Sequence, residues 1–143
     1  MPRRSSRPIP AALAAAALTL GAALAPTPPA AAYEHRDWGS TGAPDRPLRS
    51  GCHGYNYHYV VDPPSDDWAA EIFLVDPRGV KLASGAIDVD SDPARGQRSW
   101  TICRPSTVPG RFTIKMRVTW QTSITEIHKG WVEPSHFRLY RKR

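Results

Sequence analysis

The sequence lacks the features that mark several well-known classes of protein. Cys52 and Cys103 are its only cysteines, which excludes a zinc site built from four cysteines. No uninterrupted apolar run reaches the ~20 residues that a transmembrane helix needs. The motifs G-x-S-x-G and H-E-x-x-H do not occur, and there is no glycine-rich phosphate loop. These absences argue against the common hydrolases, metalloproteases and nucleotide-binding enzymes, and we expect no catalytic site and no cofactor.

The first 32 residues have the three-part layout of a secretory signal peptide. Arg3, Arg4 and Arg7 form a positive head, residues 11–24 are apolar, and Ala30 to Ala32 supply the small residues of a cleavage site. We therefore predict a leader at 1–32 and an extracellular location, with no membrane span after its removal. The richness in Ala, Pro and Arg is typical of a bacterial protein.

The net charge of the exported part is modest. The whole chain carries 19 basic and 13 acidic residues, and loss of the three leader arginines reduces its charge from +6 to +3. A charge of this size favours solubility and does not indicate specific nucleic-acid binding.

The two cysteines are expected to pair. Two cysteines in a small exported domain form a disulfide by default, and Cys52 and Cys103 do not have the C-x-x-C spacing of a redox motif. We expect the bond to bridge two strands and to clamp the two layers of the fold together.

The clearest pattern in the chain is a strand at residues 112–121. Its apolar side chains alternate with polar ones, which is typical of a half-buried strand; they are Phe112, Ile114, Met116, Val118 and Trp120. Further strands are predicted at residues 52–61, 68–75, 80–87, 98–104 and 136–141. Residues 122–134 are less clear and favour a short strand or a covering loop.

These strands predict an all-β fold in one domain. No amphipathic helix is evident after the leader, and the scattered prolines disfavour helix. We predict a small antiparallel β-sandwich of six to seven strands at residues 51–143, preceded by a flexible segment at residues 33–50.

Two stretches of the chain resemble a known family. Asp76 to Gly79 form an Asp-x-x-Gly hairpin within residues 71–85, and Pro109-Gly110-Arg111-Phe112-Thr113-Ile114 precede the long strand. In this order they resemble bacterial pre-peptidase C-terminal domains, which implies a β-sandwich and a binding role. An immunoglobulin-like domain is the rival interpretation, because Trp68 lies between the cysteines. Thr101 stands where the conserved tyrosine of that fold would be.

Surplus aromatic residues are the best candidates for a ligand surface. Tryptophan and tyrosine are favoured where proteins bind other molecules, although small sandwiches also use them to fill the core. The candidates are Tyr55, Tyr57, Tyr59 and Trp131.

A second candidate is a calcium loop. Asp88, Asp90 and Asp92 have a spacing that suits calcium on a tight turn. However, Pro93 takes the place of the glycine of an EF-hand, and Ser99 takes the place of its glutamate. A solvated acidic loop is the alternative.

The remaining features suggest how the domain would act. Arg138, Arg141, Lys142 and Arg143 form a basic end that suits an anionic polymer, or that is simply a solvated strand end. The expected function is a secreted, non-catalytic binding module whose partner is a cell-wall polymer or an extracellular protein. The alternative is a small inhibitor of an exported hydrolase, with residues 104–109 as its exposed loop.

Overall fold

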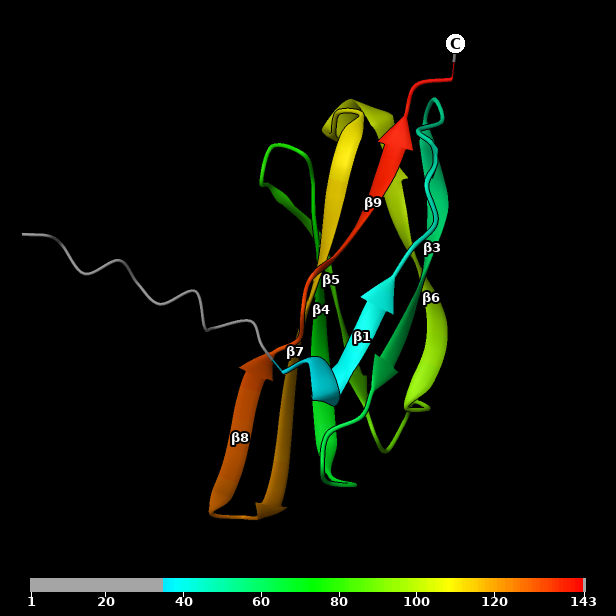
Figure 1. The fold of residues 1–143 in the computed structure, drawn as a ribbon. Coiled ribbons are helices and arrows are strands. Elements are labelled where there is room, and N and C mark those ends of the chain that lie inside the picture. Colours follow the sequence, from blue (N-terminus) through cyan, green and yellow to red (C-terminus); the bar gives the residue numbers. More distant parts are fainter. Residues whose placement is uncertain (1–34, 143) are drawn as a thin grey trace, which may run out of the picture.

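Two β-sheets pack face to face and enclose the hydrophobic core between them (Figure 1). The computed structural model describes residues 35–142, so the predicted leader and Arg143 lie outside the described residues. The three-stranded sheet has the order β1-β3-β6, formed by Gly39–Gly42, Cys52–Val61 and Arg95–Cys103. No helix in the described part is long and apolar enough to cross a membrane.

The six-stranded sheet has the order β2-β9-β7-β4-β5, and β8 pairs with the far end of β7. Its strands are β2 (Arg46–Pro47), β4 (Trp68–Val75), β5 (Lys81–Asp88), β7 (Gly110–Ser123), β8 (Glu126–Trp131) and β9 (Ser135–Tyr140). All its pairings are antiparallel except the short contact of β2 with β9. Two short 3₁₀ turns, η2 (Arg36–Trp38) and η3 (Arg104–Ser106), are the only helical elements among the described residues.

The prediction of an all-β fold is confirmed, and period-two alternation is the reason that it could be made. The five apolar residues of the long strand that begin with Phe112 all point into the core and are buried. On β4, Ile72 and Leu74 are fully buried, whereas Phe73 and Val75 on its other face are only half-buried. Apolar residues on both faces predict a central strand, and β4 indeed lies between β7 and β5.

The segment before Cys52 is part of the fold, so the prediction of a flexible segment at 33–50 is wrong for its described residues. β1 pairs with β3, and β2 pairs with β9, so the segment adds one edge strand to each sheet. Trp38 and Leu48 are buried in the common core. With β8 as the third addition, the described chain has nine strands instead of six to seven. The segment is rich in Gly, Pro and polar residues, so its sequence showed no strand pattern for β1 or β2. Both strands are stabilised by tertiary packing.

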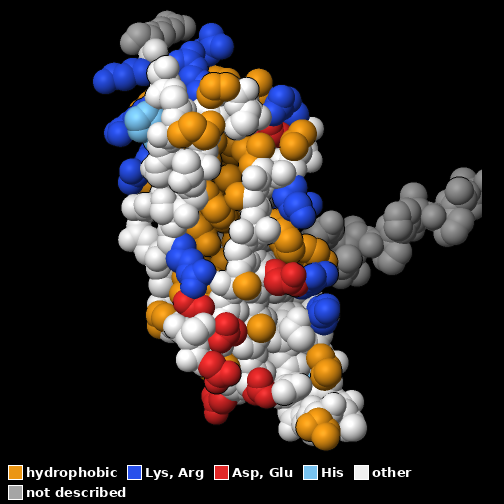
Figure 2. Space-filling view, turned by 180° about the vertical axis from the view of Figure 1, so that it is seen from behind, with side chains coloured by type: hydrophobic (Ala, Val, Ile, Leu, Met, Phe, Trp, Pro, Cys, Tyr) orange, Lys and Arg blue, Asp and Glu red, His pale blue; other side chains and the backbone are white. Residues whose placement is uncertain are grey.

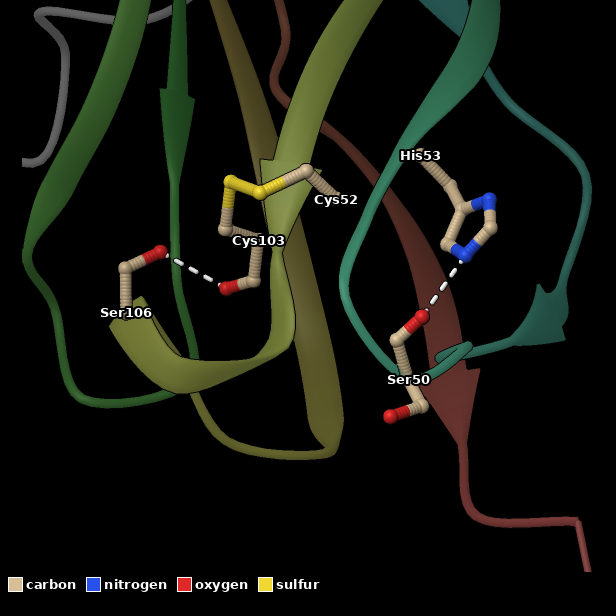
Figure 3. The surroundings of a disulfide bond; sticks show 5 residues. All are labelled: Ser50, Cys52, His53, Cys103 and Ser106. Atoms are coloured by element: carbon tan, nitrogen blue, oxygen red, sulfur yellow. Dashed lines mark hydrogen bonds between the residues drawn. A yellow bond between two sulfur atoms is a disulfide. The ribbon is translucent and has the colours of Figure 1, made fainter.

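The disulfide is confirmed, but it does not join the two layers. Cys52 and Cys103 are directly opposed in the antiparallel register of β3 and β6, and their Cα atoms are 3.9 Å apart (Figure 3). Alternation puts Cys52 on the opposite face of β3 from the buried Tyr55. The bond therefore lies on the outer face of the three-stranded sheet and fastens the start of β3 to the end of β6.

The two edge strands β5 and β6 are held together at one end of the molecule by an arginine. The Arg98 guanidinium on β6 donates a 2.9 Å hydrogen bond to the Ala86 carbonyl on β5 and forms an ion pair with Asp92. Figure 2 shows a strip of hydrophobic side chains along the long axis of the molecule. In the same view, Lys and Arg gather at the end that carries the C-terminus, and most Asp and Glu lie towards the opposite end.

Candidate binding face

The outer face of the six-stranded sheet carries aromatic rings beside positive charges. The residues at the centre of this face are brought together by the strand register. Arg117 on β7 lies opposite Trp131 on β8 and opposite Glu71 on β4. One step along, Phe73 on β4 lies opposite Lys115. Side chains in such positions point away from the core and meet their neighbours across the strands.

Two aromatic rings from neighbouring parts of this face contact each other. The ring centroids of Phe73 and Trp131 are 5.7 Å apart, with 49° between the ring planes. The Arg117 guanidinium lies 5.5 Å from the centroid of the Trp131 ring, and the Lys81 amine lies 5.4 Å from the Phe73 centroid. Phe73 and Trp131 are both half-buried, so part of each ring remains open to solvent. We call Phe73, Lys81, Arg117 and Trp131 the aromatic-cation face.

A carboxylate fixes the position of one of these cations. Arg117 donates to Glu71 through both Nε, at 2.9 Å, and a terminal nitrogen. This pairing holds the planar guanidinium in place beside the Trp131 ring, where cation–π attraction adds to the ion pair. Because Glu71 already pairs with Arg117, the Lys81 amine beside the Phe73 ring is the cation of this face that can meet a negative charge, while the half-buried rings offer an apolar surface to the same ligand.

The positive character continues along the sheet. Lys115, Lys129, Arg111 and Arg138 also lie on the outer side of β7, β8 and β9, and Arg111 is directly opposite Arg138. Partial desolvation and the nearby charge of Arg111 lower the pKa of His136, which favours the neutral form of the imidazole. Like charges directly opposite each other are destabilising, and a negatively charged ligand would relieve that repulsion.

The three tyrosines do not form a ligand surface, and this part of the predicted site is wrong. Tyr55, Tyr57 and Tyr59 are each less than 5% exposed and point into the core. The Tyr57 ring stacks on Trp100 at a centroid distance of 3.7 Å, and burial raises the pKa of the Tyr57 phenol. The pattern placed the tyrosines on one face correctly, but it could not tell whether that face was inside. Trp131 remains as the candidate aromatic residue.

The acidic loop uses its carboxylates for its own structure. Asp88 accepts hydrogen bonds of 3.1 Å from the backbone N–H groups of Asp90 and Ser91. Asp92 pairs with Arg98, and this hydrogen bond lowers the pKa of the Asp92 carboxyl. Among residues 35–142 no group of three His, Cys, Asp or Glu side chains is placed to hold a metal ion. The calcium site at Asp88, Asp90 and Asp92 stays a prediction.

The loop predicted for an inhibitor is anchored to the body of the fold. Its first three residues form η3, and Thr107 is buried with its hydroxyl on the Asp76 carboxylate. Arg78 also donates to the Ser106 carbonyl at 2.7 Å. Arg104–Ser106 are therefore in a 3₁₀ turn and not in an extended conformation.

No known family, no curated protein and no solved structure matches this chain. The resemblance to pre-peptidase C-terminal domains therefore stays a prediction.

The sequence did not single out five residues of the candidate sites: Phe73, Lys81 and Arg117 on the aromatic-cation face, and Arg49 and Arg104 at the disulfide end of the molecule. Phe73 and Arg117 alternate with core residues, and their outward direction was visible in the pattern, but their strands had to be paired before they met Trp131. Arg49 precedes Cys52 by three residues, and Arg104 follows Cys103 directly. The predicted disulfide was the signal that could have brought these two arginines together.

Proposed function

We propose that the chain is an exported, non-catalytic binding module that recognises an anionic polymer of the cell wall through the aromatic-cation face. The single observation that carries this proposal is the contact of the Phe73 and Trp131 rings on an outer sheet face, with Lys81 and Arg117 against them. Polymers of sugar or polyol units with charged groups offer both apolar C–H surfaces and negative charge.

Export is supported by two features of different kinds. The leader pattern at residues 1–32 is typical of secretion. The disulfide between Cys52 and Cys103 is a bond that persists in oxidising compartments outside the cytoplasm. An extracellular protein is the second kind of partner that such a face could bind, since Trp and Arg are enriched where proteins meet.

The test is a binding assay with the disulfide-bonded chain and purified cell walls. We expect Trp131→Ala to weaken retention on the walls at least ~10-fold, because a central aromatic residue typically carries such a share of binding energy. Ile127→Ala is the matched control, since Ile127 is a 60% exposed apolar residue on the same strand. Equal retention of both variants would refute the proposed face. If the chain captures a secreted protein instead of wall polymer, and Trp131→Ala abolishes that capture, the aromatic-cation face is still the binding site but its partner is a protein.

The alternative of a small inhibitor of an exported hydrolase stays a prediction, and no specific observation favours it over the binding module, because part of its loop is a 3₁₀ turn and Thr107 is buried.

A further inference from the structure

A cavity lined by positive charges lies at the disulfide end of the molecule. Its volume is about 360 Å³, and three separate parts of the chain line it. They are the segment between β2 and β3, the residue after β6, and the residues after β9. The lining residues are Pro47, Leu48, Arg49, Ser50, Arg104, Arg141 and Lys142.

The lining segment between β2 and β3 is held in place by contacts with the core. Leu48 is buried, and its N–H donates a 2.8 Å hydrogen bond to the Tyr140 carbonyl at the end of β9. The Tyr55 hydroxyl accepts a 3.0 Å hydrogen bond from the Arg49 N–H and donates to the Pro47 carbonyl at 3.3 Å. A buried tyrosine therefore holds the segment that carries Arg49 at a defined position.

The second part is fixed by the disulfide. Arg104 follows Cys103, and its N–H donates a 2.9 Å hydrogen bond to the Gly51 carbonyl, next to Cys52. Figure 3 shows Ser50 and Ser106 close to the cystine, on the two segments that the bond brings together. Arg49 and Arg104 are far apart in the sequence, and they line one cavity because the β3–β6 pairing places the start of β3 beside the end of β6, where the disulfide also joins the two strands.

The cavity has four cations and no acid in its lining. They are Arg49, Arg104, Arg141 and Lys142. Within residues 35–142 none of these four forms an ion pair, whereas Arg78, Arg98 and Arg117 all do. Asp76, which pairs with Arg78, and Asp45, which accepts a hydrogen bond from the Arg138 N–H, are not among the lining residues. Repulsion among unpaired like charges opposes folding, and the same potential attracts a negative ligand.

We propose that this cavity is a second binding site, which takes a tetrahedral oxyanion: a phosphate or sulfate group, free or carried by a polymer. Guanidinium forks match the oxygen atoms of such a group, and cations that approach from three sides suit its tetrahedral shape. A carboxylate, with two oxygens in one plane, uses only one fork and binds more weakly. This site does not depend on the aromatic-cation face, because it shares no residue with it.

The experiment is an NMR titration of the ¹⁵N-labelled, disulfide-bonded chain with inorganic phosphate, sulfate and chloride at one constant ionic strength. We expect saturable shifts for phosphate or sulfate at the amides of Arg49, Ser50 and Arg104, and none for chloride. Absence of saturation, or an equal response to chloride, would overturn the proposal.

Variants make the assignment specific. Arg49→Gln and Arg104→Gln should each reduce the affinity ~10-fold, the usual effect of losing one charge-assisted hydrogen bond. Arg49 is exposed, so its substitution should leave the fold intact. Weaker binding by Arg49→Gln can then be assigned to the lost guanidinium and not to unfolding. Arg95→Gln, at the opposite end of β6, is the control and should bind as the unaltered chain does. Unchanged affinity in Arg49→Gln and Arg104→Gln would refute the site.

Polymers distinguish the source of the anion. Polyphosphate and dextran sulfate present the two tetrahedral groups, and polyglutamate presents only carboxylates at similar charge density. Binding of either of the first two, at least ~10-fold tighter than polyglutamate, supports the site, and equal binding of all three would reduce it to general electrostatic attraction. Trp131→Ala should keep its affinity for inorganic phosphate, so failure of the aromatic-cation face and failure of this cavity give different results.

Discussion

The Thr107 hydroxyl donates a 3.0 Å hydrogen bond to the Asp76 carboxylate, and this contact ties the segment before β7 to the turn between β4 and β5. Asp76 is buried, and its carboxylate also accepts from the N–H groups of Arg78 and Val80 and from the Arg78 guanidinium. Gly79, which closes this turn, has a φ of 82°, where a side chain would be strained. One buried carboxylate thus holds the turn between β4 and β5 and the segment before β7 together.

Asp76→Asn should destabilise the protein at neutral pH. Burial alone would raise the pKa of Asp76, but its hydrogen bonds from Val80, Arg78 and Thr107 outweigh burial and keep the pKa below its ordinary value of 3.8. An amide cannot accept all these bonds, so we expect a loss of about 1–3 kcal/mol in the free energy of unfolding. Urea denaturation at pH 7 measures it.

The pH dependence of that difference supplies a second check. The pKa of Asp76 is lower in the folded state than in the unfolded state, where it is about 3.8. The ionised carboxylate therefore contributes fully to the free energy of unfolding above pH 3.8, and this contribution is lost as the pH falls through the lower pKa of the folded state. The gap between the unaltered chain and Asp76→Asn should therefore narrow below pH 4. A gap that stays constant down to pH 2 would contradict the assigned role.

Removing the disulfide should lower stability without changing the fold. The bond closes a loop with a sequence separation of 51, for which the simplest model gives about 4 kcal/mol and typical measurements give 2–4 kcal/mol. The β3–β6 ladder should survive in Cys52→Ala/Cys103→Ala, because it continues over eight further residue pairs as far as Val60 and Arg95. Thermal unfolding followed by circular dichroism tests this, and a double variant as stable as the unaltered chain would show that the bond is dispensable.

Tyr55→Phe should loosen the segment that carries Arg49. The variant keeps the buried ring but removes the hydroxyl that bonds to Arg49 and Pro47. We expect the Arg49 amide hydrogen to exchange faster and the free energy of unfolding to fall by about 1 kcal/mol. Tyr59→Phe is the matched control. The Tyr59 hydroxyl is on the same strand but donates to the Pro93 carbonyl in the loop before β6, and it forms no hydrogen bond with Arg49. Identical exchange at Arg49 in both variants would count against the tyrosine anchor.

Alternation along the strands made most of the fold predictable. The period-two pattern placed β3 and β4 at their observed bounds and identified the strand that carries Phe112, because one buried face leaves a clear signature. The pairing of Cys52 with Cys103 followed from compartment and number alone. The sequence did not show whether the bond joins the two sheets or two strands of one sheet, because the two cases give the same cysteine pattern.

The candidate site was far less predictable, for a physical reason. A strand pattern gives two faces but not which face is covered, so Tyr57 and Trp131 looked equally available. Burial of Tyr57 depends on Trp100, a residue from another strand, whereas Trp131, the last residue of β8, lies opposite Arg117 on the outer face of the other sheet. The short strands β1 and β2 were invisible because their stability comes from contacts distant in sequence.

The most direct test of the account maps the surface that a ligand covers. The labelled, disulfide-bonded chain is titrated with soluble anionic wall polymer, and amide and indole N–H shifts are followed. The account predicts shifts at Trp131, Phe73 and Arg117, lost in Trp131→Ala and retained in Ile127→Ala. Shifts confined to the outer face of the three-stranded sheet, around Asn56 and His58, or no shifts at saturating polymer, would contradict it.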